Sequence, residues 1–186
     1  SQDLTWKFGV QGKILGFDYT SSFSDTVLFR IDRSPHELAA YLKTKVPLGD
    51  SFIIEPGIRF NTYSDQKNNF FPELRLGLKY LINDDRYINF AVGNYHQFIQ
   101  TAQDDFNPSI IDFWIAIDKS VDAGASQQIV LGYEEYIDSR YKIQIEGYYK
   151  NIQNTLTFVD SRSSTDEILE NSSVGDNFLM SDGYAY

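Results

Sequence analysis

The chain is poor in several residue types on which other kinds of fold depend. Its 186 residues include no cysteine, one methionine and two tryptophans. Without cysteine there is no disulfide framework within these residues. No apolar run approaches the roughly 20 residues that a membrane-spanning helix needs, and the mean hydropathy is −0.35. These absences argue against a disulfide-stapled domain and against a helical membrane protein.

Aromatic residues are abundant, and they point to strands. They make up 16% of the chain, with 14 Phe and 13 Tyr. Such a composition favours β-structure over helix. Apolar residues as a whole reach 42%, which is enough for one medium-sized domain with a core in water. Composition alone therefore does not decide between a fold in water and a fold in a membrane.

Apolar and polar residues alternate along residues 141–151. Tyr141, Ile143, Ile145 and Tyr149 alternate with Lys142, Gln144, Glu146 and Lys150. Side chains on a strand point alternately to its two faces, so this pattern predicts an element with one apolar and one charged face. The same pattern is sharp in residues 72–81 and recurs through the chain. A chain built of such strands separates an apolar space from a polar one, which is typical of a transmembrane β-barrel.

The alternation predicts an antiparallel meander of seven to eight long strands. The expected strands are residues 5–17, 37–46, 52–63, 72–81, 87–100, 128–137 and 141–159, with an eighth strand at most beginning near the end. Tight turns follow residues 46, 82 and 137, and longer polar connections follow residues 19, 63, 100 and 159. Outer-membrane barrels show this rhythm, with short turns on one rim and long loops on the other.

Charge is concentrated in two of the expected long connections. Residues 101–127 hold five acids and one base, and residues 160–186 hold six acids and one base, within a chain of net charge −10. The strands carry mixed charges on one face. No net basic surface remains to neutralise phosphates, which argues against a nucleic-acid partner.

The charged face also bears on the width of the barrel. A small barrel would bring many charges into a narrow interior, where burial is costly unless each charge is paired, whereas a wide hydrated lumen carries little such cost. The sequence therefore predicts an arc of a larger barrel. The residues expected to face its lumen are Arg59, Arg75, Lys79, Glu134, Lys142, Glu146 and Lys150.

Four ordered segments give the chain a family resemblance. They are Pro72-Glu73-Leu74-Arg75-Leu76-Gly77-Leu78-Lys79-Tyr80-Leu81, Asn89-Phe90-Ala91-Val92-Gly93-Asn94-Tyr95-His96-Gln97, Ile129-Val130-Leu131-Gly132-Tyr133-Glu134 and Ile145-Glu146-Gly147-Tyr148-Tyr149-Lys150-Asn151. In order and spacing they resemble barrel strands of TonB-dependent outer-membrane receptors, and the likeness runs from about residue 37 onward. Asp112-Phe113-Trp114 and Gly183-Tyr184-Ala185 also fall where that family has similar residues.

The resemblance implies a barrel of about 22 strands in the cell outer membrane, closed by an N-terminal plug. Such receptors import scarce nutrients, such as siderophore-bound iron, cobalamin or oligosaccharides, with energy relayed by TonB. Residues 1–186 correspond to part of the barrel domain, and the sequence shows no plug, TonB box or closing C-terminal strand. The implied partners are outer-membrane lipid, a small nutrient, and TonB through an N-terminal region beyond this chain.

No enzyme, cofactor or metal site is expected. His36 and His96 lie on different expected strands without a nucleophile motif. The acidic pairs Asp104-Asp105 and Asp166-Glu167 lack the spacing of a calcium loop, and solvated loop charge is the better interpretation. In the connection 101–127, Asp112, Phe113 and Trp114 are candidate outer-loop contacts. The apolar residues around them either contact substrate or pack across the barrel mouth.

Two alternatives stay open at this point. The chain could be a small self-contained outer-membrane barrel with an adhesive or structural role, or a soluble lipocalin-like binding module. A closed apolar interior would favour the soluble module, and pairing of residues 5–17 with 141–159 would favour the small barrel.

Aromatic residues near the strand ends are interpreted as membrane-interface girdles. They are Tyr19, Tyr63, Tyr80, Tyr87, Tyr133, Tyr141 and Phe158.

Overall fold

A computed structural model describes residues 3–23, 26–102, 113–138, 140–158 and 178–185 of the chain, and every regular element among them is a β-strand. The strands are β1 (Thr5–Ile14), β2 (Phe17–Phe23), β3 (Thr26–Arg33), β4 (His36–Leu48), β5 (Phe52–Tyr63), β6 (Phe71–Asn83), β7 (Arg86–Gln97), β8 (Ile99–Ala102), β9 (Phe113–Ala116), β10 (Gly124–Ile137), β11 (Tyr141–Phe158) and β12 (Phe178–Ala185). The described part of the chain contains no helix long and apolar enough to cross a membrane.

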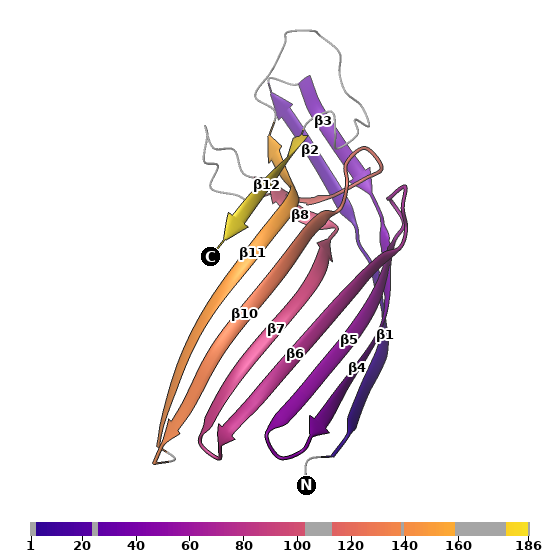
Figure 1. The fold of residues 1–186 in the computed structure, drawn as a ribbon. Helices are drawn as coiled ribbons and strands as arrows, with labels where there is room; N and C mark the ends of the chain where they lie inside the picture. The colour runs from indigo at the N-terminus through magenta and orange to yellow at the C-terminus, as the bar shows by residue number, and fades with distance from the viewer. Residues whose placement is uncertain (1–2, 24–25, 103–112, 139, 159–177, 186) are drawn as a thin grey trace.

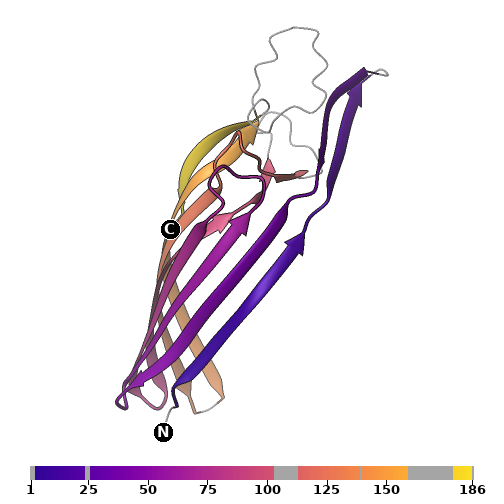
Figure 2. The same cartoon turned by 90° about the vertical axis from the view of Figure 1, so that its right-hand side faces the viewer.

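Eight of these strands form one antiparallel sheet, in the order β1-β4-β5-β6-β7-β10-β11-β12. Strands β1 and β12 are its two edges, and the described residues of these edges do not pair with each other. The sheet curves across its width into a trough (Figures 1 and 2). The predicted all-β antiparallel meander is confirmed, and β5 spans the residues expected for it.

Tight turns join the long strands at one end of the trough. The β4–β5 turn uses Gly49 with a φ of 65°, and the β10–β11 turn uses Asp138 with a φ of 52°. Glycine adopts this left-handed region without steric cost, and aspartate tolerates it better than most residues. These are the positions where the sequence predicted short turns.

Three expected connections contain strands instead. Residues 20–34, expected as a polar loop, belong largely to the β2–β3 hairpin, a separate two-stranded sheet that extends beyond the rim (Figure 2). The connection 101–127 contains β9 and the first residues of β10. The polar stretch 160–186 contains β12, which pairs with β11. The four residues of β9, Phe-Trp-Ile-Ala, are too few to show an alternating pattern.

The expected strand 87–100 is also interrupted. It leaves the main sheet after Gln97, and Phe98 is buried against the sheet instead of continuing the ladder. Strand β8 then pairs with β9 as a second small sheet. This departure brings a segment of chain back over one face of the trough.

Candidate functional site

The inserted segment, residues 98–102 and 113–123, lies across one face of the trough, near the end opposite the tight turns. We call the face that it covers the inner face, and the opposite face the outer face. Its buried side chains form an apolar cluster with side chains from β5, β6 and β11. The cluster consists of Tyr63, Phe71, Phe98, Ile115, Ile117, Val121, Ala123 and Leu156.

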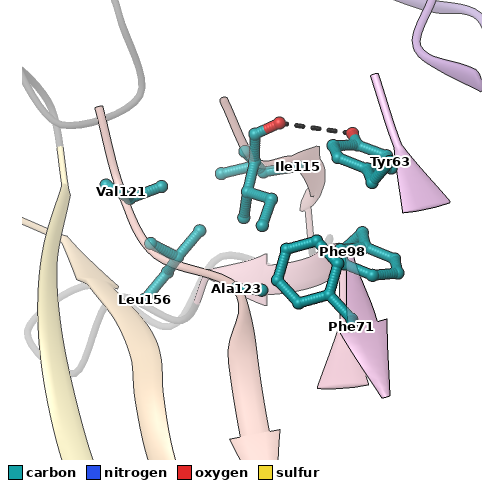
Figure 3. Close-up of a cluster of buried hydrophobic side chains, with 8 residues drawn as sticks. Tyr63, Phe71, Phe98, Ile115, Val121, Ala123 and Leu156 are labelled. Carbon is teal, nitrogen blue, oxygen red and sulfur yellow. Dashed lines mark hydrogen bonds between the residues drawn. The ribbon is translucent and has the colours of Figure 1, made fainter. Parts of the chain in front are cut away.

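Aromatic stacking anchors one side of the inserted segment. The rings of Tyr63 and Phe98 stack with centroids 4.7 Å apart, and Phe71 packs edge-on against Phe98 at 4.8 Å (Figure 3). The Tyr63 hydroxyl donates to the Ile117 carbonyl at 3.2 Å. Tyr63, expected in a membrane-interface girdle, is instead fully buried inside the trough, because position 63 falls on the inner face of β5.

Polar contacts hold the same segment to both flanks of the trough. On one flank, Arg33 pairs with Asp118 at 2.7 Å, and the Gln66 amide donates to the carbonyls of Asp118 and Val121. On the other flank, the Gln100 amide donates to the Asn154 carbonyl and accepts from the Leu156 backbone N–H. The segment therefore bridges the trough and is fixed at both sides.

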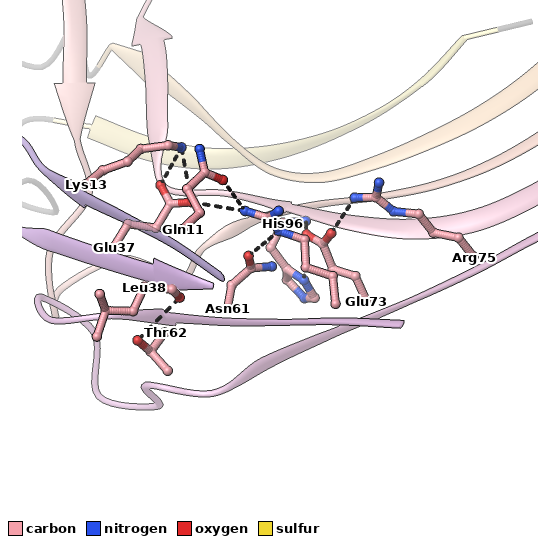
Figure 4. Close-up of polar contacts among 10 residues, drawn as sticks. Gln11, Lys13, Glu37, Leu38, Asn61, Thr62, Glu73, Arg75 and His96 are labelled. Carbon is pink, nitrogen blue, oxygen red and sulfur yellow. Dashed lines mark hydrogen bonds and ion pairs between the residues drawn. The ribbon is translucent and has the colours of Figure 1, made fainter. Parts of the chain in front are cut away.

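A polar network lies on the inner face of β1, β4 and β5, next to the place where the inserted segment contacts β5. Glu37 is buried and accepts from Lys13 at 3.0 Å (Figure 4). The Arg59 guanidinium lies 3.8 Å from the Glu37 carboxylate. Arg59 also donates to Gln11 and to the buried amide oxygen of Asn61. The charges of this network thus compensate one another across β1, β4 and β5.

Side chains replace the backbone ladder where β6 and β7 separate. The last paired residues are Arg75 and Gly93. Beyond them, the Asn94 amide accepts from the Leu74 N–H and donates to the Pro72 carbonyl. Glu73 accepts from the His96 N–H at 2.8 Å. These side chains satisfy backbone groups that the ladder leaves unpaired.

Glu73 is the most deeply buried acid of this gap, with 4% of its side chain exposed. It pairs with Arg75 at 2.7 Å, and His96 Nδ1 lies 3.8 Å from its other oxygen. That distance exceeds a hydrogen bond. Within the described part of the chain, His96 Nδ1 and Asn61 Nδ2 are buried without a hydrogen-bond partner.

A half-open pocket of about 530 Å³ lies beside this gap, on the floor formed by β7, β10 and β11. Its lining is rich in amide and hydroxyl groups and contains no acid. It consists of Tyr95, His96, Gln97, Gln100, Thr101, Gly124, Ala125, Ser126, Gln128, Lys150, Ile152, Gln153 and Thr155. The inserted segment contributes Gln100 and Thr101, so it forms one wall of the pocket.

The inner face nearer the tight turns is open and lined by paired charges. Lys43 pairs with Glu55, and Lys142 pairs with Glu134 at 3.3 Å. The ammonium of Lys79 lies 4.1 Å from the Tyr87 ring centroid. Tyr87, like Tyr63, therefore lies inside the trough and not in the expected girdle. Among the described residues, no group of three His, Asp or Glu could hold a metal ion.

The register places all seven residues expected to face a lumen on the inner face, but in different surroundings. Arg59 and Arg75 belong to the networks near the inserted segment, and Lys150 lines the pocket. The others lie toward the tight turns: Lys79, Glu134, Lys142 and Glu146.

The candidate outer-loop contacts divide differently. Asp112 lies outside the described residues, and Phe113 begins β9. Trp114 is 65% exposed, whereas its neighbour Ile115 is buried in the cluster. Sequence reasoning missed Gln66, Gln100 and Gln128, because glutamines in connections and strands carry no spacing signal.

The outer face is apolar and exposed. Leu38, Leu42, Leu74, Leu131 and Ile145 each expose two fifths or more of their surface. They come from β4, β6, β10 and β11, so the apolar surface runs across most of the sheet. Exposed apolar surface that is continuous over several strands marks an interaction surface.

No protein-family model matches the sequence, and no curated protein is significantly similar to it. The structure is similar to that of the siderophore receptor PirA from Pseudomonas aeruginosa, with a TM-score of 0.58 and 13% identity. The match covers 82% of this chain and 31% of that chain. The chain thus spans about a third of the length of that receptor, and the shared feature is the fold of its sheet.

Proposed function

We propose that this chain is part of the barrel wall of a TonB-dependent outer-membrane receptor that imports a scarce nutrient. The observation that carries the proposal is the two-faced sheet. Its outer face exposes apolar side chains across many strands, and its inner face holds charged networks and an inserted segment. Lipid would cover the outer face, and the inner face would line a hydrated lumen.

The likeness to a siderophore receptor supports the receptor class, and nutrient import is the activity we propose from it. A barrel of about 22 strands would be completed by strands pairing with the edges β1 and β12. TonB and the plug would act through parts of the receptor beyond this chain.

The two alternative functions find less support. A lipocalin-like module would enclose an apolar interior, but here the large apolar side chains are exposed on the outer face. A small closed barrel would pair β1 with β11 or β12, and the described residues of β1 pair only with β4.

The test uses the absence of cysteine from residues 1–186, with any cysteine elsewhere in the protein replaced by serine. Single cysteines at Leu74, Arg75, Ile145 and Glu146 of the full-length protein, reconstituted in bilayers, would carry nitroxide labels. We expect labels at Leu74 and Ile145 to collide with oxygen dissolved in lipid. Labels at their neighbours Arg75 and Glu146 should collide with a water-soluble nickel chelate.

Equal access of the nickel chelate to all four positions would contradict the membrane proposal. Import is tested separately, by nutrient-limited growth of cells that carry or lack the receptor gene, with and without functional TonB. Growth that depends on the receptor but not on TonB would refute the energy-coupled mechanism while leaving the barrel intact.

A further inference from the structure

The pocket on the floor of β7, β10 and β11 differs chemically from the rest of the inner face. Several lysines elsewhere on that face are paired with acids, as in Lys13–Glu37, Lys43–Glu55 and Lys142–Glu134, and Lys79 lies against the Tyr87 ring. The pocket has a lysine but no acid in its lining. In a chain of net charge −10 this is a local excess of positive charge.

Three polar side chains that line the pocket are also free to bind, those of Gln128, Lys150 and Gln153. Lys150 forms no ion pair with any described residue, and the side chains of Gln128 and Gln153 form no hydrogen bond with the described part of the chain. Gln128 and Lys150 are direct cross-strand partners on β10 and β11. Such pairs have Cβ atoms about 5 Å apart, so an amide and an ammonium would meet the same ligand group.

The floor is hollow because glycine occupies two key positions. Gly93 lies opposite Gln128, and Gly124 lies opposite Gln97. A Cβ at Gly124 would lie 2.8 Å from the Gln100 amide nitrogen, and a Cβ at Gly93 would lie 3.0 Å from the Tyr95 hydroxyl. The side chains of Gln100 and Tyr95 could not keep their positions if Gly124 and Gly93 were replaced by larger residues. The two glycines therefore leave room for the side chains of Tyr95 and Gln100, which form walls of the pocket.

Neighbouring contacts hold those walls in place. The Arg75 guanidinium lies 4.6 Å from the Tyr95 ring centroid and is itself paired with Glu73. Gln100 is fixed by its two hydrogen bonds to β11. The pocket is therefore preorganised, which reduces the entropy lost when a ligand binds.

We infer that this pocket binds an acidic sugar: a polyhydroxylated ligand with at least one carboxylate, of the uronic acid class. The inference rests on the proposed function and narrows its nutrient class. Amide and hydroxyl groups can each donate to and accept from sugar hydroxyls, the Tyr95 ring offers an apolar surface, and Lys150 binds the carboxylate. A volume of about 530 Å³ lies within the range of ordinary small-molecule sites.

The test measures binding of digalacturonate by calorimetry to the full-length receptor in detergent, with galactobiose as the neutral probe. We expect digalacturonate to bind more tightly than galactobiose, and its affinity to fall with added salt. Lys150→Gln should weaken digalacturonate binding about 10- to 100-fold, since a charge-assisted hydrogen bond is lost. Lys150→Arg should retain most of the affinity.

Two matched controls keep the result specific. Lys142→Gln removes a lysine from the same face of the same strand, about 26 Å away at eight residues' distance along the strand. Gln128→Ala, which removes the amide beside Lys150, should also weaken digalacturonate binding, and Gln127→Ala, on the other face of the same strand, is its control. Both control variants should bind like the unmodified receptor.

Equal binding of the acidic and neutral probes, or equal loss for Lys150→Gln and Lys142→Gln, would overturn the inference. So would no binding of digalacturonate to a receptor whose outer-face labels report lipid. That last result would leave the proposed function standing, whereas failure of the labelling experiment would remove the proposed function itself.

Discussion

The charged side chains of the inner face are accommodated differently at the two ends of the trough. Near the tight turns, charged side chains pair across strands and stay in contact with water, as Glu55 and Lys43 do. Near the other end, the inserted segment covers the face, and acids such as Glu37 and Glu73 are buried with their partners. Paired charges in water contribute little to stability, whereas buried groups depend on every contact. Stability differences should therefore concentrate under the inserted segment.

The largest difference is expected for aromatic residues. Phe98→Ala should destabilise the full-length protein by about 3–5 kcal/mol, because it removes a buried ring that stacks on Tyr63 and Phe71. Tyr87→Ala, at the open end, should cost less, because that ring is only half-buried. Chemical denaturation of both variants in detergent measures the difference. Equal costs would mean that the cluster does not anchor the segment.

Acids on the inner face should differ in the same direction. Glu73→Ala should cost about 1–3 kcal/mol, because it leaves the His96 N–H without its acceptor in a buried gap. Glu55→Ala removes a half-buried partner of the exposed Lys43 and should cost less than about 1 kcal/mol. Hydrogen exchange at His96 gives a local measure, since its amide should exchange faster only in Glu73→Ala. Protection at His96 that survives Glu73→Ala would contradict the proposed bridging role.

The smallest difference is expected where the backbone is left-handed. Asp138, in a tight turn, and Asn154, under the inserted segment, have φ values of 52° and 58°. Asp138→Gly should stabilise by a few tenths of a kcal/mol to about 1 kcal/mol, because glycine adopts this region without steric cost. Asn154→Gly gains the same relief but loses the hydrogen bond from the Asn154 amide to the Ala123 carbonyl. Thermal melting should therefore show a gain for Asp138→Gly and little gain or a loss for Asn154→Gly.

Much of the sheet follows from the sequence alone. Alternation in residues 52–63 and 141–159 fixes both the strands and the face of each side chain, because a one-residue shift would turn every side chain over. The inserted segment could not be predicted in the same way. Phe98, Ile115 and Ile117 look like ordinary apolar loop and strand residues, and only the fold shows that they meet Tyr63 and Phe71.

The pocket was equally hidden. Lys150 appeared as one of many charges on a polar face, and Gln128 carried no signal. What distinguishes them is that they line a pocket without an acid, and that depends on which strands lie side by side. In the sheet, β7 pairs directly with β10, although the inserted segment lies between them in the sequence. The spacing of residues along the chain does not reveal this pairing.

The described residues of the inserted segment form their own two-stranded sheet and share no ladder with the main sheet. Its attachments to the wall are side-chain contacts and the glycine floor at Gly124. Evolution can therefore exchange this segment between related proteins without disturbing strand register, as long as the anchors Tyr63, Gln66 and Asn154 remain. We expect residues 99–123 to be the part of the chain where ligand preference diverges fastest while the surrounding wall stays the same.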